Sequence, residues 1–299
     1  MRIVTNPGSN LDDDLASHLH VDLMPQRIVV DGIPHDTRST IPLSKVDAWI
    51  QRSGQHPHVQ GTTAADFVEL LGGYAKQDPS ILAVMTSRRI IGSHDAAVDA
   101  ARQLTSKATP GSLQIEIVDS CVTDVGAGLI TLLAVQARAA GLSVQATAAA
   151  LRKAASGMAS LVGVATLENL IRGGRANFLT GWVANFLEIR PLIAFVDGEL
   201  KSVGRMKARA DLGAKMKEQL LERFSPGTPC WLGISHGDDE VRANAVQSQL
   251  VDTFHPRLIF RRPLAPSIYL HLGRGAVYAV LMPISDLGFE PGNPDIGNS

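Results

Sequence analysis

The first half of the chain alternates short runs of β-branched residues with amphipathic or alanine-rich segments, and few folds accommodate this order. Strands are expected at Arg2–Thr5, Arg27–Val30, Ile81–Thr86 and Leu113–Asp119. Helices are expected at Leu11–Leu19, Ser44–Gln51, Ala64–Ala75, His94–Thr105, Val125–Ala140 and Ser143–Ala155. A helix between two strands carries the chain back so that the next strand pairs in parallel. This half is therefore predicted to be α/β with a mostly parallel sheet.

The second half adds antiparallel pairing. A turn at Asp197-Gly198 separates Pro191–Val196 from Glu199–Val203, as in a β-hairpin. Further strands are expected at Leu161–Val164, Cys230–Ser235, Leu258–Arg261 and Ala276–Met282, and helices at Lys207–Arg223 and Asp239–Thr253. The 299 residues suffice for two cores of ordinary size. We therefore predict two α/β domains, residues 1–156 and 157–299, the second with a mixed sheet.

Composition excludes several functional classes. Lys plus Arg (28) nearly balances Asp plus Glu (29), and without a basic run there is little attraction for nucleic acid. Hydrophobic residues make up 45% and charged residues 19%, which indicates a globular chain with a sizeable apolar interior. Val118-Asp119-Ser120, followed by Gly126-Ala127-Gly128, lacks the third glycine of a dinucleotide fingerprint. We expect no cofactor and no metal site.

The expected compartment is the cytoplasm. Met1–Pro7 shows no signal peptide, and Arg138 interrupts the most apolar stretch before it reaches the roughly 18 to 20 residues that span a bilayer. Cys121 and Cys230 are far apart, which fits a reducing environment. At most a transient contact with a membrane surface is expected, and the chain is expected to be a monomer.

Two strand-to-helix junctions carry clustered hydroxyls. Thr62 and Thr63 stand at the start of the expected helix Ala64–Ala75, and Ser87–Ser93 precedes the helix that follows. One threonine and Ser93 are accounted for by helix capping. Two adjacent hydroxyls exceed what one cap requires, and such junctions are where parallel sheets bind ligands. A binding role for one threonine is a second interpretation.

Two glycine-containing corners lie further on. In His271-Leu272-Gly273-Arg274-Gly275, the glycines let a ligand approach the backbone and the imidazole can donate a hydrogen bond, although a structural histidine is the simpler explanation. Arg172-Gly173-Gly174-Arg175 is a turn with two guanidinium groups, suited to solvent or to an anion or partner. No usual catalytic signature occurs.

Taken in order, these segments resemble the DegV family over nearly the whole chain, from Ile3-Val4-Thr5 to Gly275. The other matching segments are Asp31-Gly32, Thr62-Thr63, Ser87–Ser93, Val118-Asp119-Ser120, Thr166–Leu170 with Gly173-Gly174-Arg175, Arg190-Pro191, Asp197-Gly198 and Ile234-Ser235-His236. The resemblance implies the EDD fold and a long-chain fatty acid, such as palmitate, stearate or oleate, held in a tunnel between the two domains.

Residue by residue, the resemblance implies that Thr62, Ser93 and His271 bind the fatty acid carboxylate, with a protonated His271 giving the stronger bond. Thr63, Ile91, Gly92 and Arg274 are expected nearby. Three positions depart from the family pattern. Ile91 stands where the family usually has a serine, Arg274 replaces a proline, and Asn6-Pro7 replaces Asp-Ser.

In bacteria with the corresponding system, family members are the binding subunit of fatty acid kinase. The resemblance thus implies a carrier, not an enzyme, that presents the carboxylate to a separate kinase subunit for acyl phosphate formation, with Arg175 a possible contact to that subunit. Two alternatives stay open. One is an acyl hydrolase that uses Thr62 or Ser93 with His271. The other is a divergent interaction module without lipid.

Overall fold

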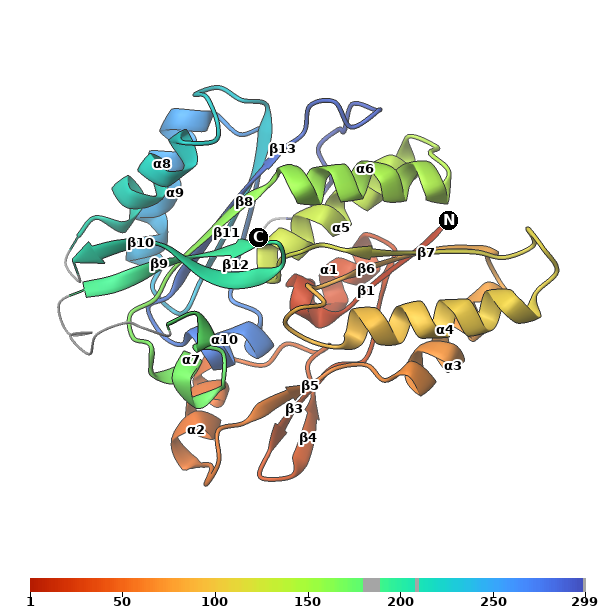
Figure 1. Ribbon diagram of the computed structural model, residues 1–299, viewed down its shortest axis with the longest axis horizontal. Coiled ribbons are helices and arrows are strands. Elements are labelled where there is room, and N and C mark those ends of the chain that lie inside the picture. The colour runs from red at the N-terminus through yellow and green to blue at the C-terminus, as the bar shows by residue number, and fades with distance from the viewer. Residues whose placement is uncertain (180–188, 208–209, 298–299) are drawn as a thin grey trace.

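The computed structural model describes residues 1–179, 189–207 and 210–297, and in it helices and sheets form alternating layers (Figure 1). Its strands are β1 (Arg2–Thr5), β2 (Val21–Leu23), β3 (Arg27–Val30), β4 (Ile33–Asp36), β5 (His58–Gln60), β6 (Ser80–Met85), β7 (Gln114–Asp119), β8 (Ala159–Gly163), β9 (Ile189–Val196), β10 (Glu199–Lys207), β11 (Cys230–His236), β12 (Leu258–Pro263) and β13 (Val277–Pro283). Its α-helices are α1 (Asp13–His18), α2 (Leu43–Arg52), α3 (Ala64–Ala75), α4 (Ser93–Lys107), α5 (Asp124–Ala139), α6 (Val144–Gly157), α7 (Glu168–Arg172), α8 (Leu212–Leu221), α9 (Glu240–Phe254) and α10 (Pro266–Leu272).

The first half contains the predicted parallel sheet. Its strand order is β2-β1-β6-β7, and every neighbouring pair is parallel. The buried faces of these strands are rich in isoleucine, leucine and valine, as expected for a sheet with helices on both sides. The predicted α/β class with a mostly parallel first sheet is confirmed.

The second half contains a mixed sheet with the order β10-β9-β8-β13-β11-β12. Only β11 and β12 pair in parallel within this order, and the other neighbouring pairs are antiparallel. Asp197 and Gly198 both have positive φ, which the predicted hairpin turn requires. The helix predicted from Lys207 begins only at Leu212, because β10 continues through Lys207, and residues 208 and 209 lie outside the described part.

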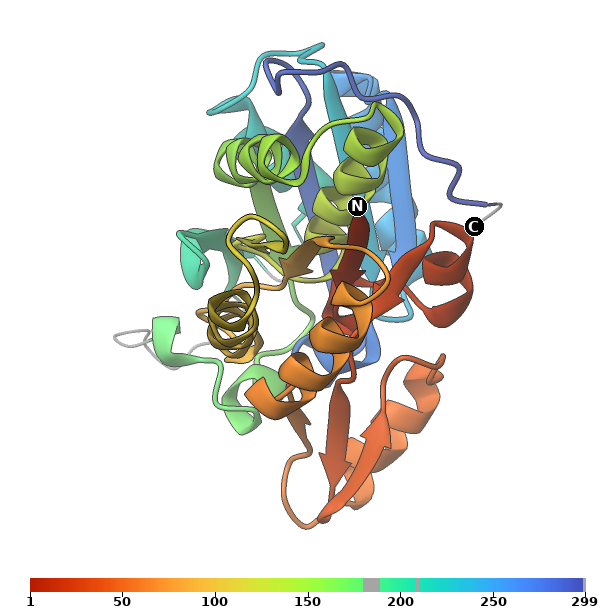
Figure 2. The same ribbon diagram turned by 90° about the vertical axis from the view of Figure 1, so that its right-hand side faces the viewer.

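Helices α5 and α6 lie between the two sheets and contact both of them (Figures 1 and 2). The parallel sheet is covered on its other face by α3 and α4, and the mixed sheet by α8 and α9. A hydrophobic cluster lies at each of three interfaces: between the parallel sheet and α3 and α4, between the mixed sheet and α8 and α9, and between the two sheets. The last cluster joins residues of both sheets through α5 and α6. The boundary at residues 156/157 stays a prediction, and it falls at the end of α6.

A small antiparallel sheet, β4-β3-β5, extends with α2 from the end of the molecule (Figure 2). Arg27–Val30 was expected in the parallel sheet, and this is wrong. Asp31 and Gly32 both have positive φ, so the chain turns back as a tight hairpin and β3 pairs with β4. The Asp-Gly pair between two apolar runs is a hairpin signal that the sequence contained.

Candidate functional site

Two small adjoining cavities lie where the predicted halves meet. Residues lining both are Ile90, Thr123, Arg175, Ile268 and His271. The first, which we call the apolar cavity, has a volume of about 40 Å³ and is also lined by Val162, Leu170, Phe195, Leu200, Leu272 and Tyr278. The second, the polar cavity, has a volume of about 30 Å³ and is also lined by Gly8, Gln26, Val59, Thr86, Ile91 and Ser267. Both cavities are mostly apolar, but the second has additional hydrogen-bonding side chains in its wall, those of Gln26, Thr86 and Ser267.

Helix α10 supplies one wall of both cavities. It begins at Pro266, whose fixed φ suits the first helical position, and ends at Gly273, where φ is +72°. Ser267 and His271 are four residues apart and therefore share a face. Among the described residues, neither Ser267 Oγ nor His271 Nδ1 has a hydrogen-bond partner, although both atoms are buried. His271 was predicted from the sequence and Ser267 was not, because the four-residue spacing between them is the only signal that Ser267 carries.

The His271 ring is confined on two sides. Its Nδ1 atom lies so close to Gly173 that a Cβ atom there would collide with the ring. The ring of His56 lies 6.3 Å away, between centroids, and His56 Nε2 lies 3.2 Å from the carbonyl oxygen of Leu270. Burial, assisted by the positive charge of Arg175, lowers the pKa of His271 to about 3. The expectation of a protonated His271 is therefore not met in this structure, and the ring is neutral near pH 7.

Arg175 lies in the wall of both cavities. Gly174, with φ of +67°, turns the chain after α7 so that the guanidinium reaches inward. It donates to the carbonyl oxygens of Ile90 at 3.2 Å and Gly173 at 3.4 Å. Within the described residues no carboxylate forms an ion pair with it, so its charge is available to a ligand. The suggested partner contact through Arg175 stays a prediction.

The hydroxyls of the Thr62-Thr63 pair have different partners. Thr63 caps α3 by a reciprocal capping box with Asp66, so its role is structural. Thr62 Oγ1 is buried and donates to the carbonyl oxygen of Pro25 at 2.5 Å. Its proton is already committed, and Thr62 does not line either cavity.

Ser93 behaves differently from the capping expectation. The cap of α4 is Gly92, and Ser93 Oγ is buried without a partner among the described residues. Ser93 and Ile91 both lie against Gly61, where an added Cβ would meet Ser93 Oγ and the Ile91 side chain. The fold thus places the Ser93 loop beside the segment that precedes Thr62, and of this set only Ile91 reaches the polar cavity wall.

Arg274 lies outside both cavities. Its side chain is 62% exposed and pairs with Asp47 at 3.2 Å and Asp238 at 2.9 Å. Tyr269 donates to the same Asp47 at 2.8 Å. These contacts connect α10 to α2 and hold the small sheet's helix against the site. Arg274 is not among the residues that line the two cavities, and its expected position near the carboxylate stays a prediction.

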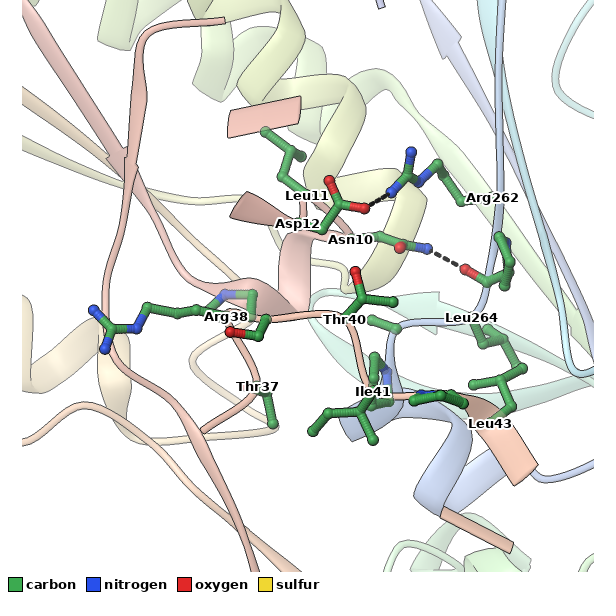
Figure 3. A pocket seen from close by; sticks show the side chains of 16 residues that line it. Asn10, Leu11, Asp12, Thr37, Arg38, Thr40, Ile41, Leu43, Arg262 and Leu264 are labelled. Carbon is green, nitrogen blue, oxygen red and sulfur yellow. Dashed lines mark hydrogen bonds and ion pairs between the residues drawn. The ribbon is translucent and has the colours of Figure 1, made fainter. Parts of the chain in front are cut away.

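A separate cavity of about 180 Å³ lies between the loop after β1, the loop before α2 and the loop between β12 and α10 (Figure 3). Arg262 pairs there with Asp12, and Asn10 donates to the carbonyl oxygen of Pro263 at 2.8 Å (Figure 3). Most of its remaining wall is proline and aliphatic. Its third charged side chain, Arg38, pairs with Asp36 outside the cavity wall, so each charge there has an intramolecular partner, and we regard the cavity as a junction between the halves.

The low pKa of His271 predicts a pH effect on stability. An unfolded histidine titrates near about 6.5, whereas folded His271 takes up a proton only near about 3. Between these values the unfolded chain binds more protons, so the free energy of unfolding decreases as the pH falls through this window. His56 and His236 act in the same direction. Urea unfolding of the parent and of His271→Gln at pH 4.5 and 7 should show a weaker decrease for the variant, and equal decreases would contradict the assignment.

Within the described residues, no α-helix is long and apolar enough to cross a membrane. The same residues contain no group of three or more His, Cys, Asp or Glu side chains placed to hold a metal ion.

Two sheets that share central helices, with two small cavities where the predicted halves meet, define the class of this α/β protein. The DegV family, described as "Uncharacterised protein, DegV family", matches residues 1–283, and the chain belongs to this family. A DegV domain-containing protein of Mycobacterium tuberculosis is 27% identical over 297 residues, covering 97% of this chain and 98% of its own.

Two solved structures share the fold. A DegV family protein of Thermus thermophilus, described by its fatty acid binding, has a TM-score of 0.84 at 22% identity and covers 95% of this chain and 100% of its own. A DegV family protein of Eubacterium eligens, loaded with heptadecanoic acid, has a TM-score of 0.81 at 15% identity and covers 95% of this chain and 99% of its own.

Proposed function

We propose that the protein binds a long-chain fatty acid between its two halves, with the acyl chain in the apolar cavity and the carboxylate in the polar cavity. The observation that carries this proposal is that the two adjoining cavities differ in their further lining, aliphatic and aromatic in one and partly polar in the other, while Arg175 and His271 line both. An elongated ligand with one charged end and one apolar end matches a pair of cavities that differ in this way. The described fatty acid binding of the Thermus protein and the heptadecanoic acid of the Eubacterium protein support it.

The energetics agree with this orientation. Each buried methylene contributes about 0.8 kcal/mol, so the acyl chain supplies most of the affinity. A buried carboxylate must be hydrogen-bonded and balanced by charge, or it takes up a proton. Arg175 supplies the positive charge, and neutral His271 supplies one N–H donor. Ser93 adds a free hydroxyl after a local movement, whereas Thr62 contributes only if it gives up the carbonyl of Pro25.

The cavities must widen to accept such a chain. Their volumes of about 40 and 30 Å³ hold only a few atoms each. The hairpin β9–β10 contributes Phe195 and Leu200 to the wall of the apolar cavity. At the turn of this hairpin, the carbonyl oxygen of Gly198 accepts a hydrogen bond of 2.7 Å from Ser87 Oγ. We propose that the acyl chain displaces side chains of this hairpin.

Native mass spectrometry of the purified protein, followed by denaturing extraction, tests the proposal. A co-purified or added C16 or C18 fatty acid, such as palmitate, stearate or oleate, bound at one per chain supports it. A protein that holds no such species and takes up none when palmitate is added contradicts it. The small cavities would then favour the interaction module without lipid.

We further propose that the protein is a carrier that presents the bound carboxylate to a separate ATP-dependent kinase subunit. Acyl phosphate formation by that subunit should require the loaded protein. The hydrolase alternative requires a residue that orients His271, and Nδ1 of this ring has no partner among the described residues. Release of nitrophenol from p-nitrophenyl palmitate, lost in His271→Ala, would favour the hydrolase.

Gly173→Ala should weaken palmitate binding several-fold and also lower stability, because the added Cβ would lie too close both to the His271 ring and to the backbone oxygen of Asn169. The new methyl group collides with the His271 ring, and the φ of Gly173 is −82°, which alanine adopts without strain. The imidazole must therefore move and its donor loses alignment. Gly54→Ala is a matched control, because a Cβ there meets nothing within 4 Å. Fluorescent fatty acid displacement measures both, and equal affinities would contradict this placement of His271.

A further inference from the structure

Ser267 has a buried hydroxyl without a role inside the described fold. The residue is 3% exposed, and Oγ has no hydrogen-bond partner among the described residues. Leaving a buried donor unsatisfied costs free energy, so such a group calls for a specific explanation. The residue also lines the polar cavity, where a ligand atom can reach it.

The surroundings of Ser267 indicate what that ligand atom is. His271 lies one turn further along the same face of α10, and it too has an unpartnered buried nitrogen. Arg175 adds positive charge to the same cavity wall. A hydroxyl, a neutral imidazole and a guanidinium around one small space form a set of donors that suits an anionic oxygen.

Ile91 lines the same cavity and offers no donor. It stands where the resemblance to the DegV family leads one to expect a serine. Ser267 faces the space that Ile91 also borders, so a hydroxyl is supplied from α10 instead of from the loop before α4.

We infer that Ser267 donates a hydrogen bond to the carboxylate of the bound fatty acid and supplies in this chain the donor that Ile91 lacks. The inference rests on the proposed fatty acid binding. It assigns Ser267 as a binding residue for the head group, specific for an anionic oxygen, and leaves the acyl chain to other residues.

Equilibrium binding of palmitate and of methyl palmitate to the parent protein and to Ser267→Ala tests the inference. We expect about a ten-fold loss for palmitate, because hydrogen bonds to charged groups are the stronger ones. The loss for methyl palmitate, whose head group is uncharged, should be clearly smaller. Thr147→Val is the matched control, since it removes another buried and unpartnered hydroxyl, on α6, that lines neither cavity.

A second variant separates hydrogen bonding from packing. Ile91→Ser in the Ser267→Ala background should restore most of the palmitate affinity, because it returns a hydroxyl to the same cavity. Unchanged affinity in Ser267→Ala, or equal losses for palmitate and its methyl ester, would overturn the role of Ser267. A parent protein that binds neither ligand would overturn the proposed function itself, and this result is distinct from the others.

Discussion

Replacing Arg175 with glutamine is expected to weaken palmitate binding about a hundred-fold. Arg175 is the permanently charged residue in the walls of the two cavities, and no described carboxylate pairs with it. Removing one partner of a buried, hydrogen-bonded charge pair costs about 2–5 kcal/mol, mostly through the charge left unpaired. Burial is the largest cause of the low pKa of His271, and it persists without Arg175, so this ring does not replace the lost charge near neutral pH.

Arg172→Gln is the control for this experiment. Arg172 lies three residues earlier, pairs with Glu168 at 3.6 Å and lines neither cavity. Calorimetric titration with palmitate should show nearly parental affinity for Arg172→Gln. Because no kinase subunit is present in this titration, a loss in Arg175→Gln reports on fatty acid binding and not on a contact with a partner. Parental affinity in Arg175→Gln would contradict a head-group role and favour the predicted contact with a partner.

Replacing Asp124 with alanine is expected to lower the free energy of unfolding by about 3 kcal/mol, because the lost acceptors leave buried donors unpaired. Asp124 is fully buried at the start of α5. Its carboxylate accepts from Asn10 Nδ2 at 2.8 Å and from the backbone N–H of Ala265 at 2.9 Å. Its φ of +55° adds strain for alanine, which tolerates this region less well than aspartate.

Guanidinium unfolding of Asp124→Ala and Asp124→Asn measures the effect. Asparagine keeps one acceptor and tolerates the same φ, so its loss should be smaller. Burial raises the pKa of Asp124. The contribution of this group to the free energy of unfolding therefore decreases as the pH rises through its folded-state pKa, and it is largest in acid. The bond from Ala265 to Asp124 also holds the start of α10, which carries Ser267 and His271, so palmitate affinity should decrease in Asp124→Ala as well. A loss under about 1 kcal/mol in Asp124→Ala would contradict the assignment, since one cap or hydrogen bond contributes that much.

Local patterns in the sequence determined most of the secondary structure. Strand Arg2–Thr5 and helix Ala64–Ala75 have the predicted bounds, because apolar periodicity and a threonine cap act within one turn or one strand. The hairpin at Asp197-Gly198 formed as expected for the same reason. Helix α10 was missed because its seven residues, most of them apolar, show no clear helical period. Strands β2 and β5 were missed because each has only three residues.

The site was only partly predictable. The resemblance to a family pointed to Thr62, Ser93 and His271, and the sequence alone showed that a glycine-rich turn carries Arg175. Which of these groups is free was decided by contacts between distant segments. Thr62 is committed to Pro25, Arg274 to Asp47, and Ser93 is not needed as a cap. Such partners lie tens to hundreds of residues apart and leave no local pattern.

By itself, then, the sequence determined the α/β class, the parallel and mixed sheets and the family, because these follow from short-range periodicity and ordered motifs. Only the tertiary structure decided the charge of His271, the inward position of Arg175 and the free hydroxyl of Ser267. Burial and hydrogen-bond partners depend on which segments pack against one another. Those contacts exist only when α10, α7 and the loop before α4 meet around the two cavities.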